Sequence, residues 1–117
     1  MRGTWGESYL RLENYSMSIM DYTKAIDLNP KMAKAYNNRG VAYLKSGDYK
    51  KAIKDFTKAI ELDPQDEDAY RNRATAWDRL GKRGLAAADR KKAEELRAAA
   101  GGKNNAKRAF LFRGNQV

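Results

Sequence analysis

The alternation of hydrophobic and polar positions across the middle of the chain predicts two amphipathic helices joined by a tight turn. Apolar and small residues recur at three- and four-residue spacing from Met32 to Lys45 and again after residue 48, which places them on one face of each helix. Gly47 is predicted to adopt a left-handed conformation and Asp48 to cap the second helix. The apolar stripe of that second helix consists of Ala52, Ile53, Phe56, Ala59, Ile60 and Leu62.

The same residue types return after 34 residues on both sides of this hairpin. A fixed period of this length indicates an array of stacked helical hairpins, because each hairpin buries its apolar face against its neighbours. The matching pairs are Gly6 and Gly40, Tyr9 and Tyr43, Tyr15 and Tyr49, Tyr22 and Phe56, Ala25 and Ala59, Pro30 and Pro64, Tyr36 and Tyr70, Tyr43 and Trp77, Ala52 and Ala86, Ala59 and Ala93, and Leu62 and Leu96.

The 34-residue period, with small residues, aromatic residues and a closing proline at fixed positions, resembles the tetratricopeptide repeat family. The resemblance implies an all-α fold, a right-handed solenoid of antiparallel helix–turn–helix repeats. We divide the chain into a truncated first repeat (1–30), a second repeat (31–64), an atypical terminal repeat (65–100), and a basic tail or short capping helix (101–117).

The first repeat is expected to form two helices, Met1–Leu12 and Tyr15–Leu28, with Asn14 capping the second. By the repeat register the first of these lacks its opening turn, so we interpret the chain as a fragment, or as the natural end, of a longer array.

The third repeat departs from the pattern at its second helix. Arg83, Arg90 and Glu94 replace aromatic or apolar residues, and Ala98 replaces the closing proline. A polar outer face predicts that no further repeat follows. The helix from about Gly84 is expected to break at Gly101-Gly102. Residues 103–117 match no repeat, and a short capping helix and a disordered tail both remain open.

Composition limits the chemistry of the chain. It contains no cysteine and no histidine, so disulfides, thiol catalysis and the usual zinc ligands are absent. We expect no enzymatic activity, no cofactor and no metal site. The sequence contains no membrane-spanning run and no signal peptide, which predicts a cytoplasmic protein that does not engage membranes.

The acidic run Asp66-Glu67-Asp68 is interpreted as a helix start, because acidic residues cap a helix and complement its dipole. The aromatic stripe, formed by Tyr9, Tyr15, Tyr43, Tyr49 and Trp77, is interpreted as core packing. The second-helix lysines Lys50, Lys51, Lys54 and Lys58 are interpreted as a solvated outer face.

The resemblance implies a binding groove on the concave side, lined by the first helix of each repeat. Five basic and three acidic residues at these positions favour an acidic peptide or a free carboxylate. Asn38 and Asn72 share one position of the repeat, so their amides are expected to stack one repeat apart and to suit a peptide backbone. The predicted groove residues are Arg11, Lys34, Asn37, Asn38, Val41, Lys45, Arg71, Asn72, Thr75 and Arg79, with Glu7, Leu10, Asp68 and Asp78 beside them.

Some members of the family bind chaperone C-termini through a carboxylate clamp of lysine, asparagine and arginine residues. The matching positions here are Gly3, Glu7, Asn38, Asp68 and Asn72, and only Asn38 fits. The resemblance therefore argues against that mode.

Two other functions remain open beside peptide binding. The net charge of +9 divides into −1, +4, +2 and +4 over residues 1–30, 31–64, 65–100 and 101–117, so the second repeat and the tail could bind RNA, although nucleic acid is the less favoured partner. A spacer or oligomerisation repeat is the other alternative, and the incompletely covered chain ends suggest a homodimer.

Overall fold

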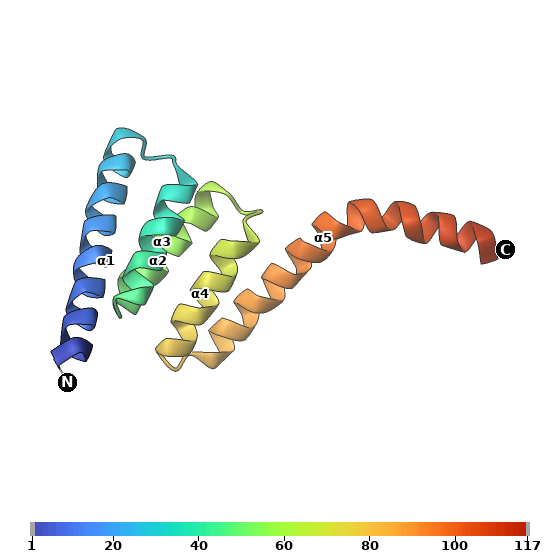
Figure 1. Cartoon of the computed structure of the whole chain (residues 1–117). Coiled ribbons are helices and arrows are strands. Elements are labelled where there is room, and N and C mark those ends of the chain that lie inside the picture. The colour runs from blue at the N-terminus through green and yellow to red at the C-terminus, as the bar shows by residue number, and fades with distance from the viewer. Residues whose placement is uncertain (1, 117) are drawn as a thin grey trace.

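The computed structural model describes the backbone of residues 2–116 and the side chains of residues 14–100. Within these limits the chain forms five helices: α1 (Arg2–Leu28), α2 (Ala33–Lys45), α3 (Tyr49–Leu62), α4 (Glu67–Arg79) and α5 (Arg83–Gln116). The hairpins α2/α3 and α4/α5 stack side by side, and α1 packs against α2 (Figure 1). The chain is an all-α helical-repeat solenoid, which confirms the predicted fold class.

The turns of the two hairpins are set by glycine and aspartate at the predicted positions. Gly47 has a φ of +90° and Gly81 a φ of +77°, values that residues with a Cβ rarely adopt. The carboxylate of Asp48 accepts from the backbone N–H of Lys51, and that of Asp66 from the N–H of Asp68. The predicted left-handed Gly47 and the predicted caps Asp48 and Asp66 are therefore confirmed.

The predicted turn in the first repeat is wrong, because α1 runs without interruption from Arg2 to Leu28. Asn14 is exposed inside this helix and does not cap a new one. The position that holds Gly47 and Gly81 in the two hairpins holds Glu13 in the first repeat. Glutamate favours a helix interior and disfavours the left-handed turn conformation, so the chain continues as a helix where the other repeats fold back.

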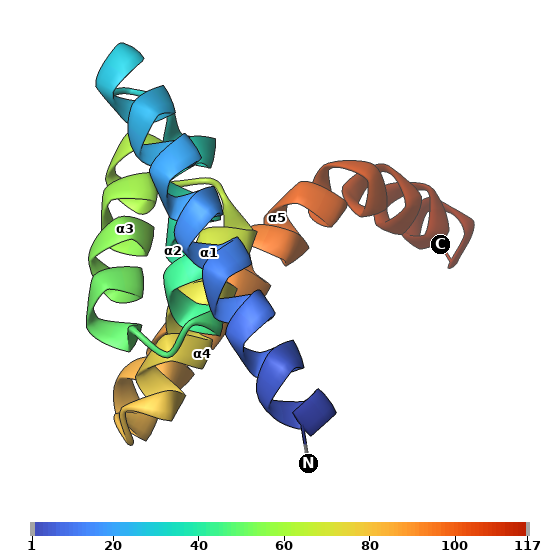
Figure 2. The same cartoon turned by 60° about the vertical axis from the view of Figure 1, so that its left-hand side comes forward.

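The predicted break at Gly101-Gly102 is also wrong, because α5 continues through both glycines to Gln116. Glycine weakens a helix interior by about 1 kcal/mol relative to alanine but retains its N–H donor. Ala98 stands where proline ends the earlier repeats, so no residue forces the backbone out of the helix. In both views the C-terminal part of α5 extends away from the stacked helices (Figure 1, Figure 2).

The core is built from alanine around one large aromatic ring. Ala52, Phe56 and Ala59 on α3 are 0% exposed, as are Ala74 and three other alanines. The ring of Phe56 lies so close to Gly40 on α2 that a Cβ there would be 2.6 Å from it. Small side chains at the crossings let the helices pack closely. The described members of the predicted aromatic stripe, Tyr15, Tyr43, Tyr49 and Trp77, are half-buried at the edges of this core.

An arginine of the second repeat, Arg39, joins three helices. The guanidinium of Arg39 on α2 donates from Nε and Nη2 to the two carboxylate oxygens of Asp55 on α3, each at 2.8 Å. The third nitrogen donates to the Thr23 hydroxyl on α1 at 3.2 Å. Asp55 is a buried carboxylate, and its hydrogen bond raises the pKa of Arg39 above the ordinary value.

The same arrangement recurs 34 residues later. Arg73 on α4 donates to both carboxylate oxygens of Asp89 on α5, at 2.8 and 2.7 Å, and to the Thr57 hydroxyl on α3 at 3.2 Å. Asp89 hydrogen bonding raises the pKa of Arg73. The sequence carries a signal for this arrangement, because arginine, aspartate and threonine each recur with the repeat period.

Within the part of the chain that the structure describes, no helix combines the length and the apolar character needed to cross a membrane.

We expect Gly40→Ala to destabilise the fold, although alanine favours a helix over glycine by about 1 kcal/mol. The new methyl group would clash with the buried ring of Phe56, and overpacking costs about 1–3 kcal/mol. Thermal unfolding followed by circular dichroism measures the change. Gly84→Ala is the control, because nothing lies within 4 Å of that position, and its melting temperature should hold or rise. A Gly40→Ala variant as stable as the parent would contradict this packing.

We expect Asp89→Ala to lower the free energy of unfolding by about 3 kcal/mol, because Arg73 would be left as a largely buried charge without its partner. The side chains of Arg73 and Asp89 are 20% and 8% exposed. Glu61→Ala removes an exposed pair with Lys58 and should cost about 0.5 kcal/mol or less. Urea denaturation of both variants gives the comparison, and equal losses would show that the buried pair contributes no more than a surface pair.

Candidate functional site

The predicted groove residues with described side chains lie on two neighbouring helices, α2 and α4, which contact each other. We call the surface they form the α2–α4 face. Its members are Lys34, Asn37, Asn38, Val41 and Lys45 on α2 and Arg71, Asn72, Thr75 and Arg79 on α4. Arg11 lies on α1, and its side chain falls outside the described residues, as do those of Glu7 and Leu10.

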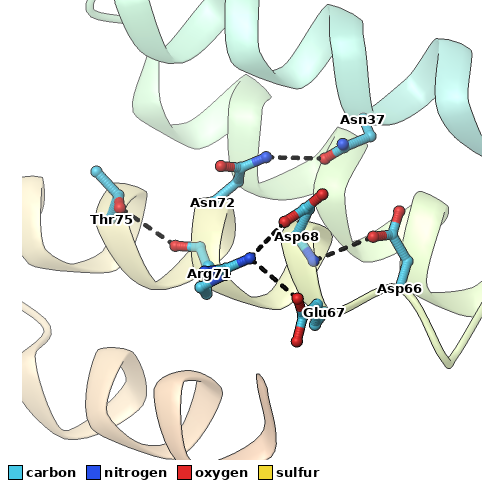
Figure 3. A network of polar contacts seen from close by, with 7 residues as sticks. All are labelled: Asn37, Asp66, Glu67, Asp68, Arg71, Asn72 and Thr75. Atoms are coloured by element: carbon cyan, nitrogen blue, oxygen red, sulfur yellow. Dashed lines mark hydrogen bonds and ion pairs between the residues drawn. The ribbon is translucent and has the colours of Figure 1, made fainter. Parts of the chain in front are cut away.

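A hydrogen bond between two asparagine side chains joins the two helices at this face. Nδ2 of Asn72 donates to Oδ1 of Asn37 at 3.2 Å (Figure 3). The bond joins Asn72 to Asn37 rather than to Asn38, which holds the equivalent position one repeat earlier. Both bonded amides are half-buried, whereas Asn38 is exposed. The bond links the two repeats and leaves the Asn38 amide facing solvent.

Arg71 is held by two carboxylates of its own helix. Its Nη2 donates to Asp68 at 2.7 Å and to Glu67 at 3.2 Å. The hydroxyl of Thr75 donates to the Arg71 carbonyl at 3.2 Å (Figure 3). Asp66 completes the network by accepting from the Asp68 N–H at 3.0 Å. The acidic run at the start of α4 therefore caps the helix and orients Arg71.

A hollow of about 280 Å³ lies between α4 and α5. Arg71 and Thr75 from the predicted set line it, but most of its wall comes from α5, which the sequence analysis did not include in the site. The signal was present in the sequence, since Arg90 and Glu94 replace apolar residues of the repeat pattern. The full lining is Glu67, Arg71, Thr75, Arg90, Ala93, Glu94 and Arg97.

Arg90, which lines this hollow, is paired with Asp78 of α4. Its guanidinium donates to the carboxylate of Asp78. This hydrogen bond lowers the pKa of Asp78, with a smaller contribution from the charge of Arg83, and it raises the pKa of Arg90. Both groups therefore stay charged near neutral pH, and the negative charge of Asp78 is neutralised locally.

The positive charges of the α2–α4 face are less fully compensated than the negative ones. Asp68 and Asp78 each pair with an arginine. Lys34, Lys45 and Arg79 are exposed, and among the described residues none of the three forms an ion pair. The face therefore carries a net positive charge.

Val41 contributes little to this surface, because its side chain is half-buried and packs against the core cluster of Ala52, Phe56 and Ala76. The face thus consists mainly of amides and exposed cations.

Comparison of the sequence with family models gives two overlapping matches. A model described as "Tetratricopeptide repeat" matches residues 33–66, and one described as "TPR repeat" matches residues 6–47. No curated protein matches the sequence.

Several solved structures share the fold. "Crystal structure of MamA" aligns with a TM-score of 0.73 at 31% identity, covering 75% of this chain and 52% of that one. This chain thus spans about half the length of MamA. The second TPR of Spaghetti (RPAP3), bound to an HSP90 peptide, aligns at 0.70 and 34% identity, covering 80% of this chain and 86% of that one. The Arabidopsis OM64 TPR domain aligns at 0.70 and 34% identity, covering 78% and 75%.

Proposed function

This chain belongs to the tetratricopeptide repeat family, whose members in general are non-catalytic modules for protein–protein interaction, and from that premise we propose that it binds an extended acidic peptide across the α2–α4 face. The hydrogen bond between Asn72 and Asn37 is the observation that carries the proposal. It brings the side-chain amides of two successive repeats together on one surface. The Asn72 oxygen and the Asn37 NH₂ group are not used in this bond.

An extended peptide presents backbone N–H and C=O groups at regular intervals, and side-chain amides can satisfy both kinds. Asn38 is exposed next to the bonded pair. Its amide has one acceptor oxygen and two donor hydrogens, and no described residue uses them. Asn38 is therefore the residue we assign to the peptide backbone.

Charge determines the kind of peptide we propose. The acidic side chains of the face are neutralised by Arg71 and Arg90, whereas Lys34, Lys45 and Arg79 face solvent. Complementary potentials increase the rate of encounter and exclude partners of like charge. An acidic peptide satisfies this pattern and a basic one does not.

The structure of the Spaghetti domain with the peptide SRMEEVD supports an acidic ligand by analogy, since that peptide has three acidic residues. The contacts must differ in this chain, because the positions of the carboxylate clamp hold Gly3, Glu7, Asp68 and Asn72 beside Asn38. We place the anchoring charges instead at Lys34 and Arg79.

Asn38→Ala should weaken peptide binding by about 1–3 kcal/mol, because a peptide backbone group would be left without its partner. Fluorescence anisotropy with labelled SRMEEVD as the probe measures the dissociation constant. Lys50→Ala on α3 is the control, since that side chain is exposed away from the face. If both variants lose the same affinity, the peptide is held by diffuse electrostatic attraction and not by the contact assigned to Asn38.

Removing the two anchoring charges together, Lys34→Gln with Arg79→Gln, should raise the dissociation constant about threefold to tenfold, as expected for exposed ion pairs. The matched control is Lys50→Gln with Lys54→Gln on α3, which lowers the net charge of +9 by the same two units. A probe with both glutamates changed to glutamine should reduce the difference. If the two double variants bind alike, net charge rather than the α2–α4 face determines binding.

A parallel salt titration with a labelled single-stranded RNA tests the main alternative. Binding through phosphates weakens steeply with salt concentration. Tight, salt-sensitive RNA binding without peptide binding would identify the chain as a nucleic-acid binder. Binding of neither probe would favour a spacer repeat.

A further inference from the structure

We propose that α1 is an exchanged arm, and that two copies of this chain form a dimer in which residues 2–12 of each copy complete the first hairpin of the other. The starting observation is that α1 stays straight where the other repeats turn. The hairpins α2/α3 and α4/α5 close at Gly47 and Gly81, both at positive φ. The equivalent residue of α1 is Glu13, and the helix passes through it.

Because α1 is straight, one of its faces has no neighbouring helix, whereas α3 has a neighbour on both sides. α3 packs against α2 on one side and α4 on the other, whereas among the described contacts α1 packs only against α2. Ala52, Phe56 and Ala59 of α3 are consequently 0% exposed. The residues at the equivalent positions of α1 are only half-buried; they are Ser18, Tyr22 and Ala25.

Residues 2–12 have the sequence pattern of the helix that would cover this face. In the second repeat the ring of Phe56 packs directly on Gly40, and Gly6 holds the position of Gly40 in the first repeat. In the third repeat the ring is replaced by Arg90 and the glycine by Ala74. Glycine thus accompanies an aromatic ring in both repeats that have one, and Gly6 is matched to the ring of Tyr22.

One copy cannot bring these two residues together. Gly6 and Tyr22 are 16 positions apart on a single straight helix, which separates them by about 24 Å. A second copy lying antiparallel can do so, because a two-fold axis near Asn14 places Gly6 of each copy opposite Tyr22 of the other: 6 and 22 are equally distant from 14. One symmetric helix–helix contact then completes both hairpins, as an isologous dimer requires.

The side of α1 that faces away from this contact also differs from that of α3. Met17 and Met20 are each 60% exposed, and the equivalent positions of α3 are Lys51 and Lys54. The solvent-exposed side of α3 thus carries lysines where α1 carries methionines.

The first test changes the turn. Light scattering across a dilution series should give twice the chain mass of 13.3 kDa for the parent protein and for Glu13→Ala, which keeps the helix. Glu13→Gly supplies the missing turn residue and should shift the population to a monomer, because each arm can then fold back on its own copy. A monomeric parent protein, or a Glu13→Gly variant as dimeric as Glu13→Ala, would overturn the proposal.

The second test detects the exchanged contact itself. Leu44 packs on the cluster that contains Ala52, and the equivalent residues of the first repeat are Leu10 and Ser18. Leu10→Cys with Ser18→Cys places two thiols in a chain that has no cysteine. On one straight helix they are about 12 Å apart, beyond the reach of a disulfide.

Mild oxidation of this double variant should give a covalent dimer on a non-reducing gel, whereas each single variant stays monomeric. An intrachain disulfide, or no disulfide, would overturn the exchange. Circular dichroism confirms that the variants keep their helices. Neither readout depends on peptide binding, so this proposal and the proposed function fail separately.

Discussion

The register of the whole array depends on an arginine that bonds two other helices at once. Arg39 on α2 reaches Asp55 on α3 with two nitrogens and Thr23 on α1 with the third. Arg73 makes the same bonds between α4, α5 and α3. Asp55 and Asp89 are buried carboxylates, and a buried charge without its partner is strongly destabilising. A shift of one helix along its neighbours would break these bonds, so the pairs define one relative placement.

That placement determines where the polar side chains of α2 and α4 lie. Asn72 meets Asn37 because the helices that carry them are held at this offset by Arg39 and Arg73. The alanine core permits the close approach, and the charged bonds select one arrangement among those that alanine would tolerate. The buried bonds inside the repeats therefore determine how the side chains of the proposed peptide-binding surface are arranged.

The first repeat lacks two of the residues that shape the other repeats. Its equivalent positions hold Trp5 in place of the arginine and Glu13 in place of the turn glycine, although Asp21 and Thr23 are retained. Without the arginine there is no bidentate bond to hold a hairpin closed, and without the glycine the turn itself is disfavoured. Both substitutions favour a continuous helix, and they leave an apolar face of α1 that α2 alone does not cover.

Local chemistry encoded in the sequence determined the period, the helix-forming faces, the caps at Asp48 and Asp66 and the turn at Gly47, because each depends on residues a few positions apart. The recurrence of arginine and aspartate was also in the sequence, but only folding showed that they meet. Whether α1 folds back or runs on, and whether Asn72 bonds Asn37 or Asn38, was decided by the tertiary structure. Those outcomes depend on the offset between packed helices and on competition between local helix stability and distant contacts, neither of which is fixed by neighbours in the chain.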